Sequence, residues 1–538
     1  MKKRHIVLSL TALLCLSQAA FSQDFQTGYF LGGYKYAFRM NPAIQNERGM
    51  FAIALGNIGL GVQSKNLGVG TFLYPMDGAV VTAFNDNVPS STFLGKLSRN
   101  GNGLGGNMGM DLLTLGFWKG LDYYTFDLRA RADLRTNLPY GLFEFLKDGT
   151  TSNDSFDLSG TSLGFDGIVE AAAGWSRRFD DRFTVGGRVK LLFGAASVRM
   201  MMNKLNVTFS EDVWSFNGQG TLEASSPSLT VNTDNNGYFS VDDIDLGNLD
   251  SPMDLLDPAG FGAAVDLGAT WDIFPWLTAS ASFLDIGGLK WNREIYGVTP
   301  DNGYTWDPAN REPIDLMDEN SSSLDGELSR LSDELENMLA FKKQNSPGGT
   351  FSMLPFRAYL GIEGRLPSYP RLTMGLLGSL TSQKYFKWSE ARMSINWNPL
   401  DWLSFSGSSG LGTLGESFGF AVNIHPRVFN LFIGSDFIPF KIIPAKNLLP
   451  ADEIDEIPLP ASFKNHIGLP TGHLNANIYV GLSLAIGKRH LTHTRSLYHA
   501  PQEEESVLEA PMEAPAEEIA VEEGSAEQET VEKQAEAE

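Results

Sequence analysis

The sequence predicts an all-β fold: a transmembrane antiparallel β-barrel of about 14 strands, within a range of roughly 12 to 16. Three observations predict this fold. Apolar and polar residues alternate along many segments, short turns alternate with longer connections, and a secretory signal comes before the first strand. After that signal no stretch has the 18 or so consecutive apolar residues of a spanning helix. The chain is therefore expected to cross a membrane as strands.

Residues 1–22 have the parts of a signal peptide. Basic residues 2–4 precede an apolar run from Ile6 to Leu16, and a small-x-small cleavage site covers Ala20 to Ser22. The only cysteine, Cys15, lies in this run after a leucine, whereas a lipoprotein site has a small residue there. The chain left after cleavage then has no cysteine, which excludes disulfides, thiolate metal sites and thiol catalysis.

Residues 23–48 are predicted to form a plug or hatch in the barrel lumen. This segment is rich in Gly, Tyr and Asn and shows little alternation, so it does not have the pattern of a wall strand. It includes the tripeptide Asn41-Pro42-Ala43, which we treat as the candidate hatch motif.

The barrel itself is predicted to span residues 49–489, and a clear strand runs from Leu121 to Asp133. Every second residue from Tyr124 onward is apolar, and the residues between them are mostly charged. The run from Asn475 to Gly487 alternates in the same way. Because successive side chains of a strand point to opposite faces, the apolar row is expected to face lipid and the polar row the lumen.

Short turns are predicted near Gly120, Asp180, Pro275, Tyr369, Pro399 and Pro426, with longer connections between them. This asymmetry is typical of bacterial outer-membrane barrels, whose short turns are periplasmic. Six of the ten tryptophans lie near these turns: Trp118, Trp175, Trp271, Trp276, Trp397 and Trp402. They are expected to form an interfacial girdle. The alternative is a chance grouping of core aromatic residues.

Charged residues on the predicted lumen face form the candidate site. They are Asp127, Arg129, Arg131, Glu170, Arg188, Lys190, Arg357, Glu363, Glu390 and Arg392. One hypothesis is a polar track that guides a solute. The other is that opposite charges brace the interior, where an unpaired charge would be costly. Both signs occur in similar numbers, so a strong filter for anions or cations is not expected.

Two short motifs resemble those of a known group of barrels. Asn41-Pro42-Ala43 resembles the signature near the mature N-terminus of the long-chain fatty acid transporter (FadL) family and its PorV-like relatives, and the stretch from Leu284 to Trp291 looks like their Asp-hydrophobic-Gly turn. The whole plan also resembles an uncharacterised outer-membrane family of Gram-negative bacteria. The resemblance implies a barrel of about 14 strands with an N-terminal hatch. It implies no ligand-contacting residue.

Residues 490–538 are predicted to be a disordered acidic periplasmic tail. Positions 501–538 hold 14 Glu and one Lys and few residues that could form a core. This composition accounts for much of the chain's net charge of −23. The acidity is therefore no evidence for a cationic substrate.

Loop patterns predict two helices and exclude one nucleotide site. Residues 323–343 have leucines at helical spacing, and Pro139 to Gly149 is a shorter segment of the same kind. Gly101, Gly103 and Gly106 spell GxGxxG, but a strand pattern follows where dinucleotide binding needs a helix.

These features predict a passive outer-membrane channel for hydrophobic or amphipathic small molecules. The alternative is a structural or secretion-system accessory barrel that anchors partner proteins. The expected partners are outer-membrane lipid, a hydrophobic small-molecule ligand and a periplasmic or secretion-system protein, with no nucleic acid.

Enzymatic activity is not expected. Within the predicted barrel the histidines are His425, His466 and His473, and none accompanies a GxSxG motif. We therefore assign no catalytic residue, no cofactor and no metal ligand.

Overall fold

The computed structural model describes residues 24–54, 56–76, 79–149, 155–209, 214–240, 243–247, 257–292, 294–299, 304–306, 340–345, 349–382, 387–438, 442–444, 468–470 and 475–490. They belong to one unit, residues 1–498, and residues 499–538 form a second unit. The predicted signal peptide, residues 1–22, and all but the first residue of the predicted tail, residues 490–538, lie outside the described residues. Both remain predictions.

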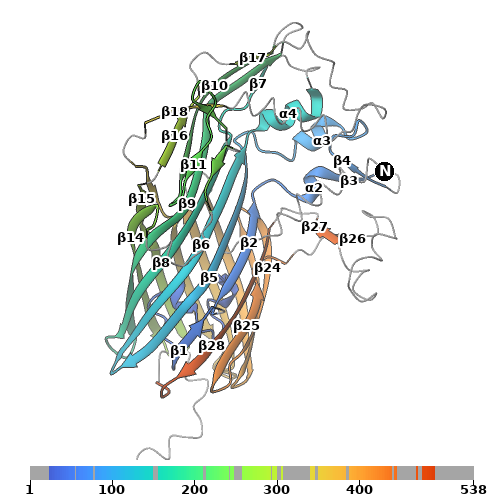
Figure 1. Ribbon diagram of the computed structural model, residues 1–538. Helices are drawn as coiled ribbons and strands as arrows, with labels where there is room; N and C mark the ends of the chain where they lie inside the picture. Colours follow the sequence, from blue (N-terminus) through green and yellow to red (C-terminus); the bar gives the residue numbers. More distant parts are fainter. Residues whose placement is uncertain are drawn as a thin grey trace, which may run out of the picture. The chain divides into compact units, whose positions relative to one another are not determined.

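Strand pairing among the described residues forms a closed antiparallel barrel of 14 strands, as predicted (Figure 1). The wall strands are β1 (Gly49–Ile53) with β2 (Ile58–Ser64), β5 (Asn102–Lys119), β6 (Asp122–Leu138), β8 (Ser162–Arg178), β9 (Phe183–Phe209), β14 (Gly260–Phe274), β15 (Leu277–Trp291), β20 (Phe356–Arg365), β21 (Leu372–Ser382), β22 (Lys387–Leu400), β23 (Leu403–Gly412), β24 (Gly415–Ile424), β25 (Phe429–Ser435) and β28 (Ala476–Ile486). β1 and β2 share the first position, because both pair with β5 and with β28.

Shorter elements lie in the plug segment and in the connections between wall strands. They are η1 (Gln26–Gly28), η2 (Ala37–Arg39), α2 (Val69–Phe72), β3 (Leu73–Met76), β4 (Ala79–Thr82), α3 (Ser90–Leu94), α4 (Tyr140–Asp148), β7 (Ser155–Asp157), β10 (Trp214–Ser225), β11 (Thr230–Val231), β12 (Tyr238–Phe239), β13 (Ile244–Asp245), β16 (Glu294–Val298), β17 (Tyr304–Trp306), β18 (Phe341–Gln344), β19 (Phe351–Met353), β26 (Ile442–Pro444) and β27 (Gly468–Pro470).

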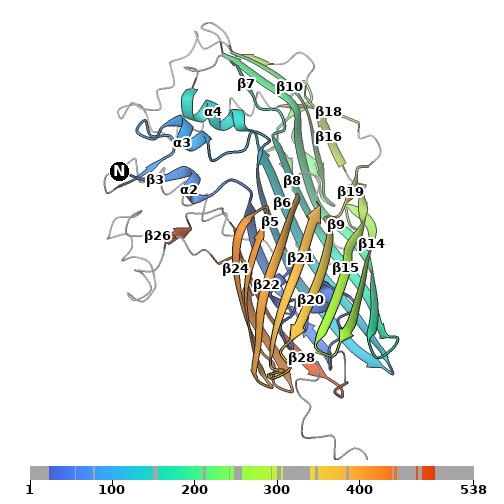
Figure 2. The same ribbon diagram turned by 180° about the vertical axis from the view of Figure 1, so that it is seen from behind.

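The wall strands bury their polar rows and expose their apolar rows. In β22, the buried residues include Arg392 and Asn396, and the residues between them include the exposed Met393 and Ile395. Figure 2 shows β22 beside β21 and β20 in this wall. This inversion of the usual soluble pattern is the surface of a transmembrane barrel, with lipid outside and polar groups inside. No helix among the described residues is long and apolar enough to span a membrane.

Five of the six tryptophans near the short turns face outward. Trp175, Trp271, Trp276, Trp397 and Trp402 are exposed, as an interfacial girdle requires.

Trp118 corrects the predicted girdle. It pairs with the buried Tyr123 across the β5–β6 turn, so the strand parity turns it inward. Its Nε1 donates to the carbonyl oxygen of Asn46 at 2.9 Å, and its ring stacks on His490.

Two of the predictions made for the loops are confirmed, and a third falls mostly outside the described residues. The segment from Pro139 to Gly149 does contain a helix, α4, and β5 follows the GxGxxG glycines as expected. The predicted helix at residues 323–343 lies mostly outside the described residues, but its last three residues belong to β18, a strand that begins at Phe341.

The Asp-hydrophobic-Gly stretch is not a turn at the end of a strand. β15 continues through it to Trp291, which pairs with Gly260. Asp285 takes a positive φ of 59° where the register with β14 shifts, so the stretch forms a bulge within the wall.

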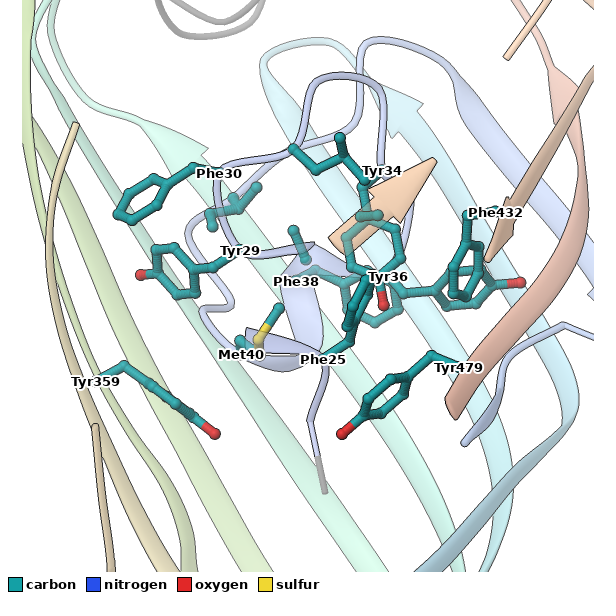
Figure 3. Packing of buried hydrophobic residues seen from close by; sticks show 14 of the residues in the cluster. Phe25, Tyr29, Phe30, Tyr34, Tyr36, Phe38, Met40, Tyr359, Phe432 and Tyr479 are labelled. Atoms are coloured by element: carbon teal, nitrogen blue, oxygen red, sulfur yellow. The ribbon is translucent and has the colours of Figure 1, made fainter. Parts of the chain in front are cut away.

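Residues 24–48, which we call the plug, lie inside the barrel, and most of them are buried. Figure 3 shows Phe25, Tyr29, Tyr34 and other aromatic plug residues packed against wall residues such as Phe432. The large apolar core of the molecule therefore joins the plug to the inner wall.

Candidate functional site

The first half of the plug, residues 24–34, attaches by aromatic packing. The ring of Phe25 stacks on Tyr479 with centroids 4.7 Å apart, and Tyr34 meets Phe432 edge-on at 4.8 Å. Wall glycines make room for these rings, because a Cβ built on Gly375 or Gly434 would overlap a plug phenylalanine. Because glycine has no side chain, these wall positions leave the space that this half of the plug occupies.

Polar side chains of the wall satisfy the plug backbone in this half. Asn423 and Asn430 donate to the carbonyl oxygens of Gly32 and Gly33 at 2.9 and 3.2 Å. Asp436 accepts hydrogen bonds from two backbone N–H groups at the start of η1, at 3.0 and 2.7 Å. A carboxylate is favourable there, since these N–H groups lack intrahelical partners.

A buried ion pair stands beside this half of the plug. The Arg392 guanidinium donates to Glu390 at 2.7 Å and to the hydroxyls of Ser408 and Ser417 at 2.8 and 2.9 Å. Two predicted site residues, Glu390 and Arg392, therefore pair with each other.

The second half of the plug, residues 35–48, attaches through ions. The Arg39 guanidinium lies 2.9 Å from both Asp111 and Asp127. Arg188 pairs with the same Asp127 at 2.6 Å and with Asp266 at 3.1 Å. One plug cation is thus inserted into a buried chain of wall charges.

Asp285 is the centre of the neighbouring charges. Its carboxylate lies 2.7 Å from Lys190, 2.5 Å from Arg357 and 3.4 Å from Arg131. The bulge in β15 aims this side chain into the lumen, and its positive φ is one that Asp tolerates better than most residues. Arg357 also pairs with Asp24 of the plug.

The hatch motif docks on paired wall glycines. Asn41 donates to the hydroxyl of Tyr29 at 3.1 Å and to a wall carbonyl on β14 at 3.2 Å. Gly186 of β9 and Gly268 of β14 face each other in register, and a Cβ on either would overlap Asn41 or Pro42. Ala43 closes the motif, because its N–H donates to the Asn41 side chain at 3.0 Å.

A hollow that is partly open to solvent lies over Asp24 at the start of the plug. We call it the lumen pocket. Its lining residues are Asp24, Asn107, Met108, Arg129, Arg131, Asp133, Pro355, Arg357, Thr381 and Trp388. Charged groups therefore share the pocket with a thioether and an indole.

Arg129 differs from the other cations of the lumen pocket. Its nearest carboxylate oxygen, on Asp111, is 3.8 Å from Nε, and this Nε has no hydrogen-bond acceptor among the described residues. Arg131 and Arg357 both reach Asp285 more closely. Arg129 is thus the cation of the lumen pocket with the weakest pairing.

Burial changes the acidity of several plug groups. It lowers the pKa of Lys35 to about 8, with Glu47 acting in the opposite direction and the cations Arg48 and Arg489 lowering it further. Burial also raises the pKa of the Tyr36 phenol, an effect to which Asp111 adds. Lys35 is therefore the plug group that titrates closest to neutral pH among those whose pKa is shifted here.

The structure brings together most of the predicted site residues. Seven lie in the charge network beside the plug: Asp127, Arg129, Arg131, Glu170, Arg188, Lys190 and Arg357. Glu363 is half-buried on β20, opposite Thr278.

Sequence reasoning missed four partners of this network, which are Asp24, Arg39, Asp111 and Asp285. It also missed Asp436, which binds the plug backbone. Asp24 and Arg39 lie in the plug, whose lack of periodicity gives no inward direction for a side chain. Asp111 carried a usable signal, because it is the only acidic residue in β5 and lies in the middle of this strand of glycines and apolar residues. Among the described residues no group of three or more His, Asp and Glu side chains is arranged to hold a metal ion.

Comparison with known proteins gives one family. A sequence model described as Family of unknown function (DUF5723) matches residues 42–436. No curated protein matches the chain in sequence.

Solved barrels are similar only at a low level. The toluene transporter TodX of Pseudomonas putida has 8% sequence identity and a TM-score of 0.38, with 87% of this chain and 99% of that chain covered. The toluene transporter TbuX of Ralstonia pickettii has 10% identity and a TM-score of 0.38, covering 88% and 100%. A FadL homologue of Pseudomonas aeruginosa has 11% identity and a TM-score of 0.38, covering 87% and 99%.

Proposed function

The chain belongs to the Family of unknown function (DUF5723), and we propose that it is a passive outer-membrane transport barrel for amphipathic small molecules that carry an acidic group. The lumen pocket is the observation on which this proposal depends. A carboxylate bound there would pair with Arg129, and an apolar chain would contact Met108 and Trp388. A purely apolar solute would instead leave the guanidinium of Arg129 desolvated with only its long contact to Asp111, which is costly.

The first wall strand is the part of the wall that bears on how a solute passes the plug. It is interrupted between Ile53 and Ile58, and Ala54 takes a positive φ of 58° there. Gly56 lies against the plug, since a Cβ on it would be 3.0 Å from the hydroxyl of Tyr36. A displacement of the plug would therefore change the contacts at the interruption, and we propose this place in the wall as the exit for a solute held in the lumen pocket.

A binding comparison tests this proposal. The full chain in a non-ionic detergent is titrated with dodecanoate and, separately, with dodecanol, and binding is followed by tryptophan emission. We expect dodecanoate to bind about tenfold more tightly or better, because a hydrogen bond to a charged group contributes about 1.5–3 kcal/mol. Arg129→Gln should remove this preference.

Arg135→Gln is the matched control for Arg129→Gln. Arg135 lies on the same strand with similar exposure, but it already pairs with Asp166. Its loss should leave the preference for dodecanoate unchanged. Equal binding of the two probes by the unaltered chain, or a preference that survives in Arg129→Gln, would contradict the proposal.

The second candidate function is a structural or secretion-system accessory barrel. The ion-paired plug favours it, since a lumen filled in this way also suits a rigid anchor. Purification in mild detergent with mass spectrometry of bound molecules, together with single-channel recording, separates the two functions. The accessory function predicts neither a bound small molecule nor a conductance.

A further inference from the structure

Asp133 is the carboxylate of the lumen pocket with the weakest pairing. Its Oδ2 lies 3.5 Å from the Nε of Arg131, and this is the single ion pair that the described residues give it. Arg131 is shared, because its Nη1 lies 3.5 Å from Glu170 and 3.4 Å from Asp285. Asp133 therefore competes with two other carboxylates for its cation.

Asp24, the other carboxylate of the lumen pocket, is better paired. It pairs with Arg357 and accepts a hydrogen bond from the Tyr359 hydroxyl at 3.2 Å. Its side chain is only 4% exposed, compared with 14% for Asp133. Asp133 is thus the carboxylate of the pocket that is most open to a further cation.

The strand β6 presents Arg129 and Asp133 on the same face, because the two residues are four positions apart and side chains alternate. The Arg129 guanidinium leans toward Asp133. A Cβ built on Gly109 would overlap this guanidinium, and Gly109 of β5 lies opposite Arg131. From the level of Arg131 to that of Asp133 is two residues, about 7 Å along a strand. The weakly paired cation and the weakly paired carboxylate therefore line one pocket a short distance apart.

A carboxylate bound to Arg129 would have Asp133 as a neighbour. Two negative charges at this separation repel each other, and the repulsion is stronger in a partly buried pocket than in water. An ammonium group beside the bound carboxylate would offset this repulsion and would give Asp133 a second cation. The pair Arg129 and Asp133 thus fits a solute that carries both charges better than a simple acid.

An indole offers a further contact for an ammonium group. Trp388 lines the same pocket, is 5% exposed, and packs with Leu414 and Phe437 in one hydrophobic cluster. Tryptophan is the aromatic residue that attracts cations most strongly, and quaternary ammonium groups are recognised in this way. A cation that reaches Asp133 therefore shares the pocket with a tryptophan that is held in place by packing.

We propose that the lumen pocket selects zwitterionic amphiphiles, in which an ammonium group lies next to the acidic group. The acid pairs with Arg129, and the ammonium pairs with Asp133 in the pocket that Trp388 lines. This inference rests on the proposed function and narrows its class of solutes, because a simple fatty acid would satisfy Arg129 alone.

Three probes with the same dodecyl chain test this inference: dodecanoate, dodecyltrimethylammonium, and N-dodecyl-N,N-dimethylglycine, which carries both charges. The full chain in a non-ionic detergent is titrated with each probe by calorimetry. We expect the zwitterion to bind about tenfold more tightly than dodecanoate, the size expected for a quaternary ammonium held away from water. It should also bind more tightly than dodecyltrimethylammonium, which leaves Arg129 without a partner for its charge. In Asp133→Asn the zwitterion should lose its advantage over dodecanoate.

Asp122→Asn is the matched control for Asp133→Asn. Asp122 lies on the same strand, pairs with Arg177 at 3.6 Å and is 20% exposed, but it is at the other end of β6 and is not a lining residue of the lumen pocket. The advantage of the zwitterion should be unchanged in this variant.

Dodecanoate binding shows whether Asp133→Asn is folded. This variant should bind dodecanoate at least as tightly as the unaltered chain, because the neighbouring negative charge is removed. If Asp133→Asn does not fold, Trp388→Leu is the second variant. It keeps an apolar side chain but removes the indole, so it should reduce the advantage of the zwitterion about threefold.

Three results would overturn the inference. They are equal binding of the zwitterion and dodecanoate by the unaltered chain, an advantage of the zwitterion that survives in Asp133→Asn, and binding of dodecyltrimethylammonium as tight as that of the zwitterion. The proposed function fails separately, when dodecanoate binds no more tightly than dodecanol. The two failures are therefore distinguishable.

Discussion

Two sides of the barrel wall hold the plug by different chemistry. The wall of β6, β8, β9, β14 and β15 contributes buried ions and meets Arg39 and the hatch motif (Figure 1). The wall of β22 to β25 contributes mostly serine and asparagine, with one ion pair and Asp436, and meets the aromatic half of the plug (Figure 2).

The difference indicates which attachment yields first. A buried ion that loses its partner is left uncompensated, so the charged wall permits one position of the plug and resists any other. A neutral hydrogen bond contributes much less, and hydroxyl or amide groups can find a new partner or water. We therefore expect plug movement to begin on the neutral wall, with Arg39 acting as the fixed point.

The largest effect is expected from the charged wall. Asp285→Asn keeps the size and the tolerance of a positive φ but removes the charge on which Lys190, Arg357 and Arg131 converge. The loss of one partner of a buried ion group should reduce the free energy of unfolding by about 3–5 kcal/mol. Urea unfolding of the folded barrel in detergent measures this loss of unfolding free energy. A loss below about 1 kcal/mol would show that the two walls do not differ in this way.

The next largest effect is expected at Gly186, where the hatch motif docks on the wall. Gly186→Val places a side chain where the carbonyl of Pro42 lies, so the plug must shift, at a cost of about 1–3 kcal/mol. Gly187→Val is the control, because a Cβ there meets only ordinary contacts beginning at 3.5 Å. Limited proteolysis within residues 24–48 should rise only in Gly186→Val. Equal proteolysis of the two variants would mean that the hatch motif does not need the space that Gly186 leaves in the wall.

A smaller effect is expected from the neutral wall. Ser406→Ala removes the hydroxyl that donates to the Asn396 side chain at 2.7 Å. A neutral hydrogen bond contributes about 1 kcal/mol, so the same urea experiment should show a loss of this size. A loss equal to that of Asp285→Asn would remove the contrast between the walls.

A pH dependence is also expected from Lys35. Its pKa is about 8 in the folded chain and about 10.5 unfolded, so between these values the unfolded state binds more protons and stability rises with pH. Below pH 8 the ammonium is charged in both states and the burial penalty is complete. Slower plug hydrogen exchange at pH 9.5 than at pH 7.5, after correction for intrinsic rates, should be seen in the unaltered chain and lost in Lys35→Met. A slope that survives in Lys35→Met would assign the effect to another group.

The barrel was predictable from the sequence because one physical constraint acts on every wall residue. A strand between hydrocarbon and water must alternate, so parity alone gives the inward direction of Arg129, Arg188 and Arg392. The same alternation turns Trp118 inward, but its position near a turn had predicted an outward-facing girdle residue. Alternation along the strand is therefore a better guide to the direction of a side chain than closeness to a turn.

The plug contacts were not predictable in the same way. No periodicity constrains residues 24–48, and Arg39 reaches Asp127 over 88 positions of sequence. Asp285 was assigned to a turn, because a bulge within a strand and a turn share the residues Asp and Gly. Contacts of this kind form only when the whole barrel closes around the plug, so no local sequence pattern predicts them.

A disulfide between plug and wall tests the account most directly. Thr27→Cys with Ser408→Cys joins the plug to the neutral wall at two side chains whose hydroxyl oxygens lie 2.7 Å apart, and the chain's one native cysteine lies in the predicted signal peptide. In proteoliposomes, dodecanoate flux should stop when the pair is oxidised and return when it is reduced, while each single variant should be insensitive to the redox state. Flux that is unchanged by oxidation would show that the plug need not move, and would contradict the account.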